Sequence, residues 1–329
     1  MILILTEPAD LHADHVAQKL HDRSVPFVRF NSADFPRHAR LSVHFQGKDD
    51  NQYVLQAHDE SVELTGLKAI WYRRPKPSIA HARLTDTATR TATQQECDTF
   101  LYDLWNSVGG MWVPGPPFVL QRWRKVAQLG FAQELGFEVP PTLVTNSPDE
   151  LIAFYRQHSG NIVSKRVGSS FLSSEASPFC RYTDVVSKRD IGYAQAIRYA
   201  PMIFQAYVPK ELELRITVVG SQVFAAEIHS QVTNHTRYDW RRFDHYHTPY
   251  LPHELPPSVA QRCAQLVHRM GLTFGAIDMI LTPDGRYVFI EINANGQYLW
   301  IEYATGLPIS DAVCDLLIRG PTHSPLGHE

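Results

Sequence analysis

Three side chains near the C-terminal end of the sequence carry oxygen donors at a spacing that could hold a metal ion. Glu291 and Asn293 are two positions apart in the apolar run YVFIEIN, and Asp278 lies in the preceding apolar run FGAIDMIL. Residues two apart on a strand point to the same face, and a hairpin would bring Asp278 opposite them. Two carboxylates and an amide suit Mg²⁺, which usually keeps water and substrate phosphates as its other ligands. The alternative is a solvated polar face, but runs this apolar make an uncompensated charge costly. We therefore predict a magnesium site.

Two lysines could hold the phosphates of a nucleotide, because an ammonium is a compact positive charge. Lys165 lies in NIVSKRV, flanked by valines as an internal strand residue would be. Lys125 lies in the arginine-rich stretch QRWRK, and a charge cluster on a helix face is usually just solvated. The Gly-Ser-Ser loop around Ser169 could present backbone N–H groups to phosphate, although most such loops are only turns.

The elements that must position these residues alternate between strand-like and helix-like patterns. From residue 1 to about 112, apolar runs and a helical stretch at 10–23 predict a small α/β domain. No G-x-G-x-x-G follows the first strand, so no dinucleotide site is indicated there. The proline-rich VPGPP at 113–117 is typical of a connection. Beyond it we predict a central domain at 118–200 and a C-terminal domain at 201–320.

In these two domains the periodicity predicts a helix from 120 to about 136, ending before Pro140. The next helix, at 147–160, would begin with a capping box formed by Ser147 and Glu150. Further helices are expected at 256–271 and 308–320, and strands are expected at 142–145, 161–167, 203–208, 214–220, 223–230, 274–281 and 287–296.

Composition limits the classes of protein that fit. The chain has 329 residues and a formal charge of −3, so no overall charge favours nucleic acid or an anionic membrane surface. The opening MILILT is too short for a signal sequence, and no run approaches the ~20 apolar residues of a membrane span. The four cysteines lack C-x-x-C spacing and are expected to be free thiols of a cytoplasmic protein.

The order of these elements resembles the ATP-grasp superfamily: two lysines, the strand FQAYV, the strand ELRITVVG, then Asp and Glu-x-Asn. The strings WYRRP, ELGFEVPPTLVTN, VPKELELRITVVG, YDWRR and EINANGQ are similar to graspetide macrocyclases, which build microviridin-type rings on ribosomal peptides. The resemblance covers residues 1 to about 320. It implies an α/β ATP-grasp fold with an N-terminal pre-ATP-grasp domain and ATP held between the central and C-terminal domains.

The resemblance also implies roles by position. Asp278, Glu291 and Asn293 match the Mg²⁺ ligands. Glu213 falls near the ribose or the reacting centre, and Arg215 matches the arginine that steadies the transferring phosphate or acyl phosphate. The expected nucleotide contacts are Lys125, Lys165, Gln205 and the backbone of Ala206, Tyr207 and Val208.

The first hypothesis for function is a macrocyclase that uses ATP to turn Asp or Glu side chains of a precursor peptide into acyl phosphates and joins them to Thr, Ser or Lys. Phosphoryl transfer needs mainly positioning and charge neutralisation, which Mg²⁺, Lys and Arg supply. The alternatives are an amino-acid or small-molecule ligase of the same fold and a nucleotide-binding protein without ligase activity. The intact Asp278, Glu291 and Asn293 set argues against the last. Relatives suggest a homodimer.

A polar loop at 233–253 is rich in arginine and histidine. Its arginines, Arg237, Arg241 and Arg242, could pair with acidic side chains of a bound peptide or simply form an exposed charge cluster. Its histidines, His235, His245, His247 and His253, fit no structural zinc spacing. The arginines of WYRRP, Arg73 and Arg74, have no role assigned.

Overall fold

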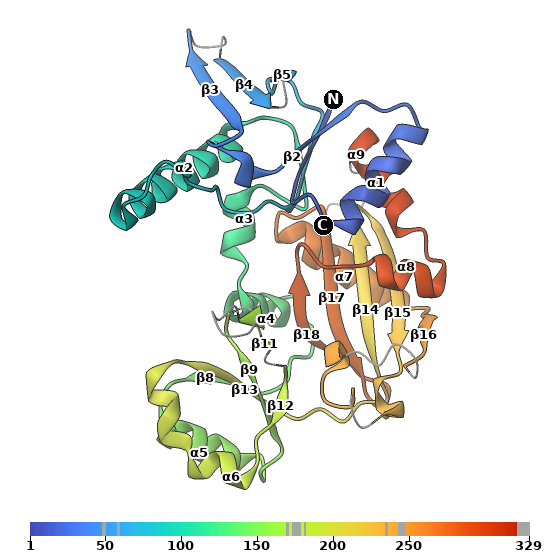
Figure 1. Ribbon diagram of the computed structural model, residues 1–329. Coiled ribbons are helices and arrows are strands. Elements are labelled where there is room, and N and C mark those ends of the chain that lie inside the picture. The colour runs from blue at the N-terminus through green and yellow to red at the C-terminus, as the bar shows by residue number, and fades with distance from the viewer. Residues whose placement is uncertain are drawn as a thin grey trace.

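The computed structural model describes residues 1–47, 51–57, 60–168, 171–172, 179–180, 182–233, 236–242 and 248–320. Figure 1 shows three regions: an N-terminal region around β1, a central region around β9 and β13, and a C-terminal sheet around β14 and β17. The described elements form a mixed α/β structure with several sheets. The predicted fold class is confirmed, whereas the predicted division at residues 112, 118 and 200 stays a prediction.

The N-terminal region is built on a parallel sheet with the order β2-β1-β6-β7. Strand β1 is buried along its whole length, as its uninterrupted apolar sequence predicts for a strand covered on both faces. The strands are β1 (Ile2–Thr6), β2 (Phe27–Phe30), β6 (Ala69–Arg74) and β7 (Met111–Val113), with helices α1 (Leu11–Asp22) and α2 (Thr87–Ser107) and the short η1 (Ser32–Asp34). A separate antiparallel sheet contains β3 (Ala39–Phe45), β4 (Asn51–Ala57) and β5 (Glu60–Glu63).

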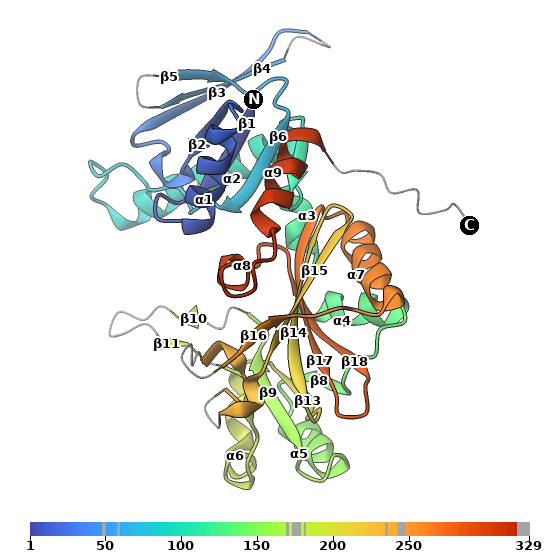
Figure 2. The same cartoon turned by 90° about the vertical axis from the view of Figure 1, so that its right-hand side faces the viewer.

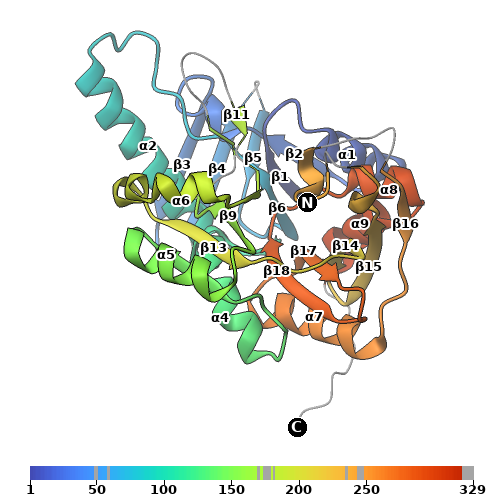
Figure 3. The same cartoon turned by 90° about the horizontal axis from the view of Figure 1, so that it is seen from below.

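The central region is an antiparallel sheet with the order β12-β9-β13-β8, covered by α5. Its strands are β8 (Thr142–Thr145), β9 (Ile162–Arg166), β12 (Asp184–Val185) and β13 (Met202–Ala206). The other elements here are α5 (Pro148–Gln157), α6 (Lys188–Gly192), η2 (Ala194–Tyr199) and the paired β10 (Phe171–Leu172) and β11 (Phe179–Cys180). Seen from below (Figure 3), β9 and β13 lie beside the β17–β18 hairpin.

The C-terminal sheet is antiparallel with the order β16-β15-β14-β17-β18. Its strands are β14 (Leu212–Val219), β15 (Gln222–Ile228), β16 (Tyr250–Pro252), β17 (Phe274–Leu281) and β18 (Tyr287–Asn293). Alternate residues of β14, such as Leu214 and Ile216, join one apolar core with α4 (Lys125–Glu134) and α7 (Pro257–Arg269). Because strand neighbours face opposite sides, Glu213 and Arg215 point to the other face. The remaining elements are η3 (Ser230–Val232), η4 (Trp240–Arg242), α8 (Leu299–Thr305) and α9 (Ile309–Arg319).

The single helix predicted from 120 to 136 is wrong, because the chain forms two helices there. Helix α3 (Pro117–Arg122) ends at Arg122 with Trp123 as its C-cap, and α4 begins at Lys125. The Trp123 indole donates to the Met270 carbonyl at 2.6 Å and lies against the Phe131 ring, so tertiary contacts override the local periodicity. The break makes Lys125 the first residue of α4.

The predicted capping box of α5 is only half formed. Ser147 Oγ accepts from the Glu150 N–H, as predicted. The Glu150 carboxylate instead accepts from Thr145 Oγ1, and that same hydroxyl accepts from the Ser147 N–H. The Thr145 hydroxyl therefore accepts from the Ser147 N–H, which is the contact that the capping box predicts for the Glu150 carboxylate.

Two further expectations concern cysteines and membrane segments. The side chains of Cys97, Cys263 and Cys314 are free thiols, as predicted. Along the described ranges, no helix combines the length and the apolar character needed to cross a membrane.

Candidate active site

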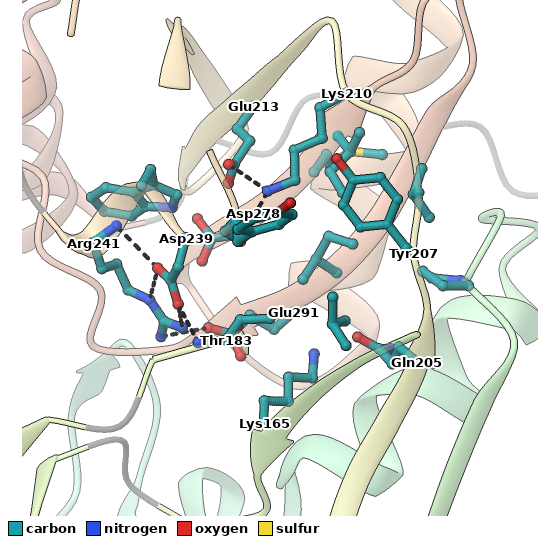
Figure 4. Close-up of a pocket in the computed structure, with 18 of the residues that line it drawn as sticks. Lys165, Thr183, Gln205, Tyr207, Lys210, Glu213, Asp239, Arg241, Asp278 and Glu291 are labelled. Carbon is teal, nitrogen blue, oxygen red and sulfur yellow. Dashed lines mark hydrogen bonds and ion pairs between the residues drawn. The ribbon is translucent and has the colours of Figure 1, made fainter. Parts of the chain in front are cut away.

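A pocket lies between the central sheet and the C-terminal sheet, on the face of β14 and β17 opposite α7. Figure 4 shows side chains from both sheets converging there, with Lys165 and Gln205 on the central side and Asp278 and Glu291 on the C-terminal side. A site between two such regions can close around a ligand and exclude water.

The predicted metal ligands come together on the β17–β18 hairpin. Asp278 and Glu291 are directly paired across the two strands. The Asn293 amide nitrogen lies 3.3 Å from Asp278 Oδ2 and 3.3 Å from Glu291 Oε1. A register shift follows Asp278, and strand irregularities of this kind often lie beside active sites, where they re-aim side chains.

The carboxylates of Asp278 and Glu291 are both buried, but their pKa values shift in opposite directions. Burial raises the pKa of Asp278, although Arg215 lies beside it. Burial would also raise the pKa of Glu291, but the charges of Lys165, Lys125 and Arg241 together lower it to about 2. Glu291 is therefore held ionised by cations.

The donor set fits Mg²⁺. Two acidic side chains and one amide supply the hard oxygen donors that Mg²⁺ prefers. Nearby cationic side chains compensate the buried carboxylate charge, which would otherwise be costly. The Asn293 amide faces the carboxylates with its nitrogen, so a rotation about the last side-chain bond would present its oxygen to a cation. In the described part of the chain, no cluster of three or more His, Cys, Asp or Glu side chains suits a metal, so the site depends on the amide.

The two predicted phosphate lysines approach the hairpin from different elements. Lys165 projects from β9 and is only 6% exposed, and burial lowers the pKa of its ammonium to about 8. Lys125 Nζ donates to the Arg166 carbonyl at 3.2 Å and lies 3.6 Å from Glu291 Oε2. The helix break places Lys125 at the start of α4, and β9 supplies Lys165, so both lysines lie beside Glu291. Ser169 lies outside the described residues.

Arg215 is held on both sides of its guanidinium. Its Nη1 donates to Asp278 Oδ1 at 2.8 Å, and its Nη2 donates to the Gln297 carbonyl at 3.1 Å. Strand β14 pairs Arg215 directly with Asp278. The predicted neighbourhood of Arg215 and the metal ligands is therefore present.

The predicted adenine segment forms the edge of the pocket. Gln205 Nε2 donates to Thr142 Oγ1 at 2.9 Å. The N–H groups of Ala206 and Tyr207 already donate to the carbonyls of Pro141 and Asn161. A base bound here would therefore meet the remaining backbone groups of the segment, which ends at the pocket-lining Val208.

Glu213 faces the pocket but is already engaged. Its Oε1 accepts from Lys210 Nζ at 2.7 Å and from Ser230 Oγ at 2.9 Å. Burial raises the pKa of Glu213 against the opposing charge of Lys210. Sequence reasoning missed Lys210, although its place three residues before a buried acid was a usable signal.

The three predicted loop arginines have different surroundings. Arg241 Nε and Nη2 donate to the two oxygens of buried Asp239 at 2.8 and 2.6 Å, and Arg241 Nη1 lies 3.7 Å from Glu291 Oε1. Arg242 pairs with Asp184 of β12, and Arg237 is exposed. Asp239 also accepts from the Thr183 N–H at 2.8 Å, so it anchors Arg241 to the central region. Sequence reasoning missed Asp239, although it stands in the YDWRR string.

The loop histidines offer no zinc site among the described residues. His253 Nδ1 lies 2.7 Å from Glu227 Oε1, and His253 Nε2 lies 3.1 Å from the Tyr287 hydroxyl. His235, His245 and His247 lie outside the described residues.

Known proteins resemble this chain over nearly its whole length. Residues 1–116 match the family model of the MvdD pre-ATP grasp domain. The structure is similar to a RiPP-associated ATP-grasp ligase from Chryseobacterium gregarium, solved with ADP and a leader and core peptide, at 32% identity and TM-score 0.88 over 96% of each chain. A search of curated protein sequences gave no match.

Two macrocyclases from Microcystis aeruginosa are also similar in structure to this chain. MdnC, solved with the precursor peptide MdnA, is 30% identical with TM-score 0.85, and MdnB is 33% identical with TM-score 0.80. Each comparison covers 97% of this chain and 99% of the other. The ATP-grasp ligase PsnB, at 21% identity, shares the fold. With identities of this size over nearly the whole length, the chain belongs to the ATP-grasp ligases of ribosomal-peptide maturation, the family of the microviridin macrocyclases.

Proposed function

We propose that this protein is a Mg²⁺-dependent macrocyclase that forms ω-ester or ω-amide bonds between side chains of a precursor peptide. The observation that carries the proposal is the meeting of Lys125, Lys165, Arg215 and Arg241 around the paired carboxylates Asp278 and Glu291. An arrangement of cations around a metal site on a rigid hairpin suits the transfer of a phosphoryl group. The relatives solved with peptides support a peptide as the substrate.

The reaction would proceed in two steps. A side-chain carboxylate oxygen of the peptide attacks the terminal phosphorus of ATP, which forms an acyl phosphate and releases ADP. A hydroxyl or amine of the same peptide then attacks the acyl carbon, loses its proton and expels phosphate. Mg²⁺ bound by Asp278, Glu291 and Asn293 would neutralise charge on the nucleotide phosphates.

The chain's own cations divide the remaining work. Lys165 and Lys125 would contact the phosphates, because both lie beside Glu291. Arg215, with its fork fixed between Asp278 and the Gln297 carbonyl, would meet the reacting carboxylate and then the transferring oxygens. Arg241 lies near Glu291 Oε1, whereas Lys125 lies near Glu291 Oε2, and Arg241 would contribute to the same charge neutralisation.

Of the loop arginines predicted to contact the peptide, we assign that role to Arg237 and a different role to Arg241. Arg237 is exposed and is free to meet acidic side chains of the peptide. Arg241 belongs with the phosphate-binding cations, because Asp239 directs it into the pocket. We further propose that the enzyme acts as a cytoplasmic homodimer, and light scattering of the purified protein tests the dimer.

The test is a reaction with ATP, Mg²⁺ and a precursor peptide that has a leader and an acidic core, as the peptide bound to the Chryseobacterium relative has a leader and a core. The expected result is loss of one water from the peptide for each bond formed, with one ADP released per bond, and none with a chelator present. Addition of a free amino acid to the peptide would favour the amino-acid ligase alternative. Release of ADP without any change in the mass of the peptide would contradict the proposal.

A further inference from the structure

The turn that follows the metal strand is held by two buried arginines from different sheets. The 293–298 turn connects Asn293 at the end of β18 to α8. Its Asn295 carbonyl accepts from Arg73 Nη1 at 2.8 Å, and its Gln297 carbonyl accepts from Arg215 Nη2 at 3.1 Å. Arg215 lies on β14 in the C-terminal sheet, whereas Arg73 lies on β6 in the N-terminal sheet.

The turn packs against Arg215 without any spare room. A Cβ atom added to Gly296 would lie 2.6 Å from Arg215 Nη2 and 2.3 Å from Ala276 Cβ. Both separations are far below van der Waals contact, so the backbone at Gly296 limits where the guanidinium can lie. A shift of the turn would therefore move Arg215 or the adjacent Asn293.

The N-terminal region holds this turn at more than one point. Arg73 is 2% exposed, and its Nε lies 3.2 Å from Asp10 Oδ2. Asp10 caps α1 by accepting from the His12 N–H at 3.0 Å. His12 Nε2 in turn accepts from the N–H groups of Tyr298 and Leu299 at 3.0 and 3.2 Å, where the turn enters α8. In Figure 2, α1 lies alongside the N-terminal sheet and α8 lies below α1.

Arg73 carries a cost that stability alone does not explain. Its Nη2 is buried and has no hydrogen-bond partner among the described residues. A buried donor without a partner destabilises the folded state, because it loses its hydrogen bonds to water. A buried arginine with an unsatisfied donor therefore needs an explanation other than stability, and a functional role is one.

We propose that Arg73 is a positioning residue for the metal site and for Arg215, although it lies in a different sheet and contacts no reacting group. It fixes the 293–298 turn through the Asn295 carbonyl, and the turn fixes the Asn293 amide and the Arg215 guanidinium. The inference rests on the proposed function, because it assigns the second layer of support around the proposed Mg²⁺ ligands.

The test measures metal binding without turnover, using Mn²⁺ as a paramagnetic probe in the presence of ADP. Loss of an outer-layer contact typically weakens metal binding ~10- to 100-fold. We expect Arg73→Met to weaken Mn²⁺ binding by about tenfold or more while the affinity for ADP in chelator stays within about twofold. Arg73→Lys, which keeps the charge beside Asp10 but not the forked reach to Asn295, should keep the melting temperature and still lose Mn²⁺ affinity. The matched control is Arg74→Met, because Arg74 is the exposed neighbour on the same strand.

Each outcome decides the question. Weaker Mn²⁺ binding in both Arg73 variants, with Arg74→Met unchanged, supports positioning. Wild-type Mn²⁺ affinity in a folded Arg73→Lys protein overturns the inference and leaves the proposed function intact. If Arg73→Met does not fold, the lysine variant still decides. Absence of Mn²⁺ binding in the wild-type protein would refute the proposed metal site, and the inference with it.

Discussion

Two arginines reach the same pair of carboxylates by different routes. Arg215 lies on β14, where strand pairing places it directly opposite Asp278. Arg241 lies in the 236–242 segment, where its direction depends on a bidentate contact with Asp239. A strand fixes the facing of its side chains by its own period, whereas an irregular segment needs anchors from elsewhere. The site thus has two parts. Its rigid half consists of Arg215, Asp278 and Glu291 on paired strands. Its irregular half consists of Asp239 and Arg241, whose position depends on the contact between two regions.

The largest effect should come from the rigid half. Asp278→Asn or Glu291→Gln should lower turnover by about a thousandfold or more, because each removes a charge from the proposed metal site without changing size. Asparagine keeps the shape of Asp278 and an oxygen that can accept from Arg215, so the melting temperature should stay nearly unchanged. The measurement is ADP release with the precursor peptide. Asp284→Asn, at the exposed turn of the same hairpin, is the control, and normal turnover in the two site variants would sink the metal assignment.

Arg215→Ala should come next, with a loss of about two to three powers of ten in single-turnover bond formation. Its contribution should appear in the transition state, so binding of Mg·ATP and peptide should stay close to wild type. Arg215→Lys should not restore full activity, because one ammonium cannot reproduce the fork. Arg286→Ala, at an exposed residue in the turn between β17 and β18, serves as control. A variant that fails only because ATP no longer binds would show that Arg215 has another role.

The irregular half should show a smaller and non-additive effect. Asp239→Asn should lower turnover by about ten- to a hundredfold, because Arg241 loses its anchor and is misplaced rather than removed. A double-mutant cycle is the measurement. The pair Asp239→Asn and Arg241→Ala should lose no more than Arg241→Ala alone. Additive losses would mean that Asp239 acts independently of Arg241, and Asp149→Asn, an exposed acid on α5, is the control.

The smallest effect is expected at Arg242. Its pairing with Asp184 is partly exposed, with side-chain exposures of 30% and 48%. Such pairs contribute ~0–1 kcal/mol, so Arg242→Ala should change the melting temperature by a few degrees at most and turnover by less than about threefold. Steady-state kinetics with varied peptide concentration would check this. A rise of about tenfold or more in KM for the peptide would instead restore the peptide-binding role suggested by the sequence.

The difference between the two halves also explains what sequence alone could predict. The pairing of Asp278 with Glu291 follows from strand period and a hairpin turn, and the family resemblance placed both lysines. The break at Trp123 could not be read locally, because it depends on the Met270 carbonyl, 147 positions away. Arg73 was left without a role for the same reason, since its partner Asn295 is 222 positions away.

The central claim is that ATP activates a peptide carboxylate as an acyl phosphate. The most direct test labels the side-chain carboxylates of the precursor peptide with heavy oxygen and follows the label during bond formation. Because the attacking carboxylate oxygen leaves with the phosphoryl group, each bond formed should release one phosphate that carries a labelled oxygen. Mass spectrometry of the phosphate and the peptide measures both. Bond formation with unlabelled phosphate, or labelled peptide left unchanged while ATP is hydrolysed, would contradict the account.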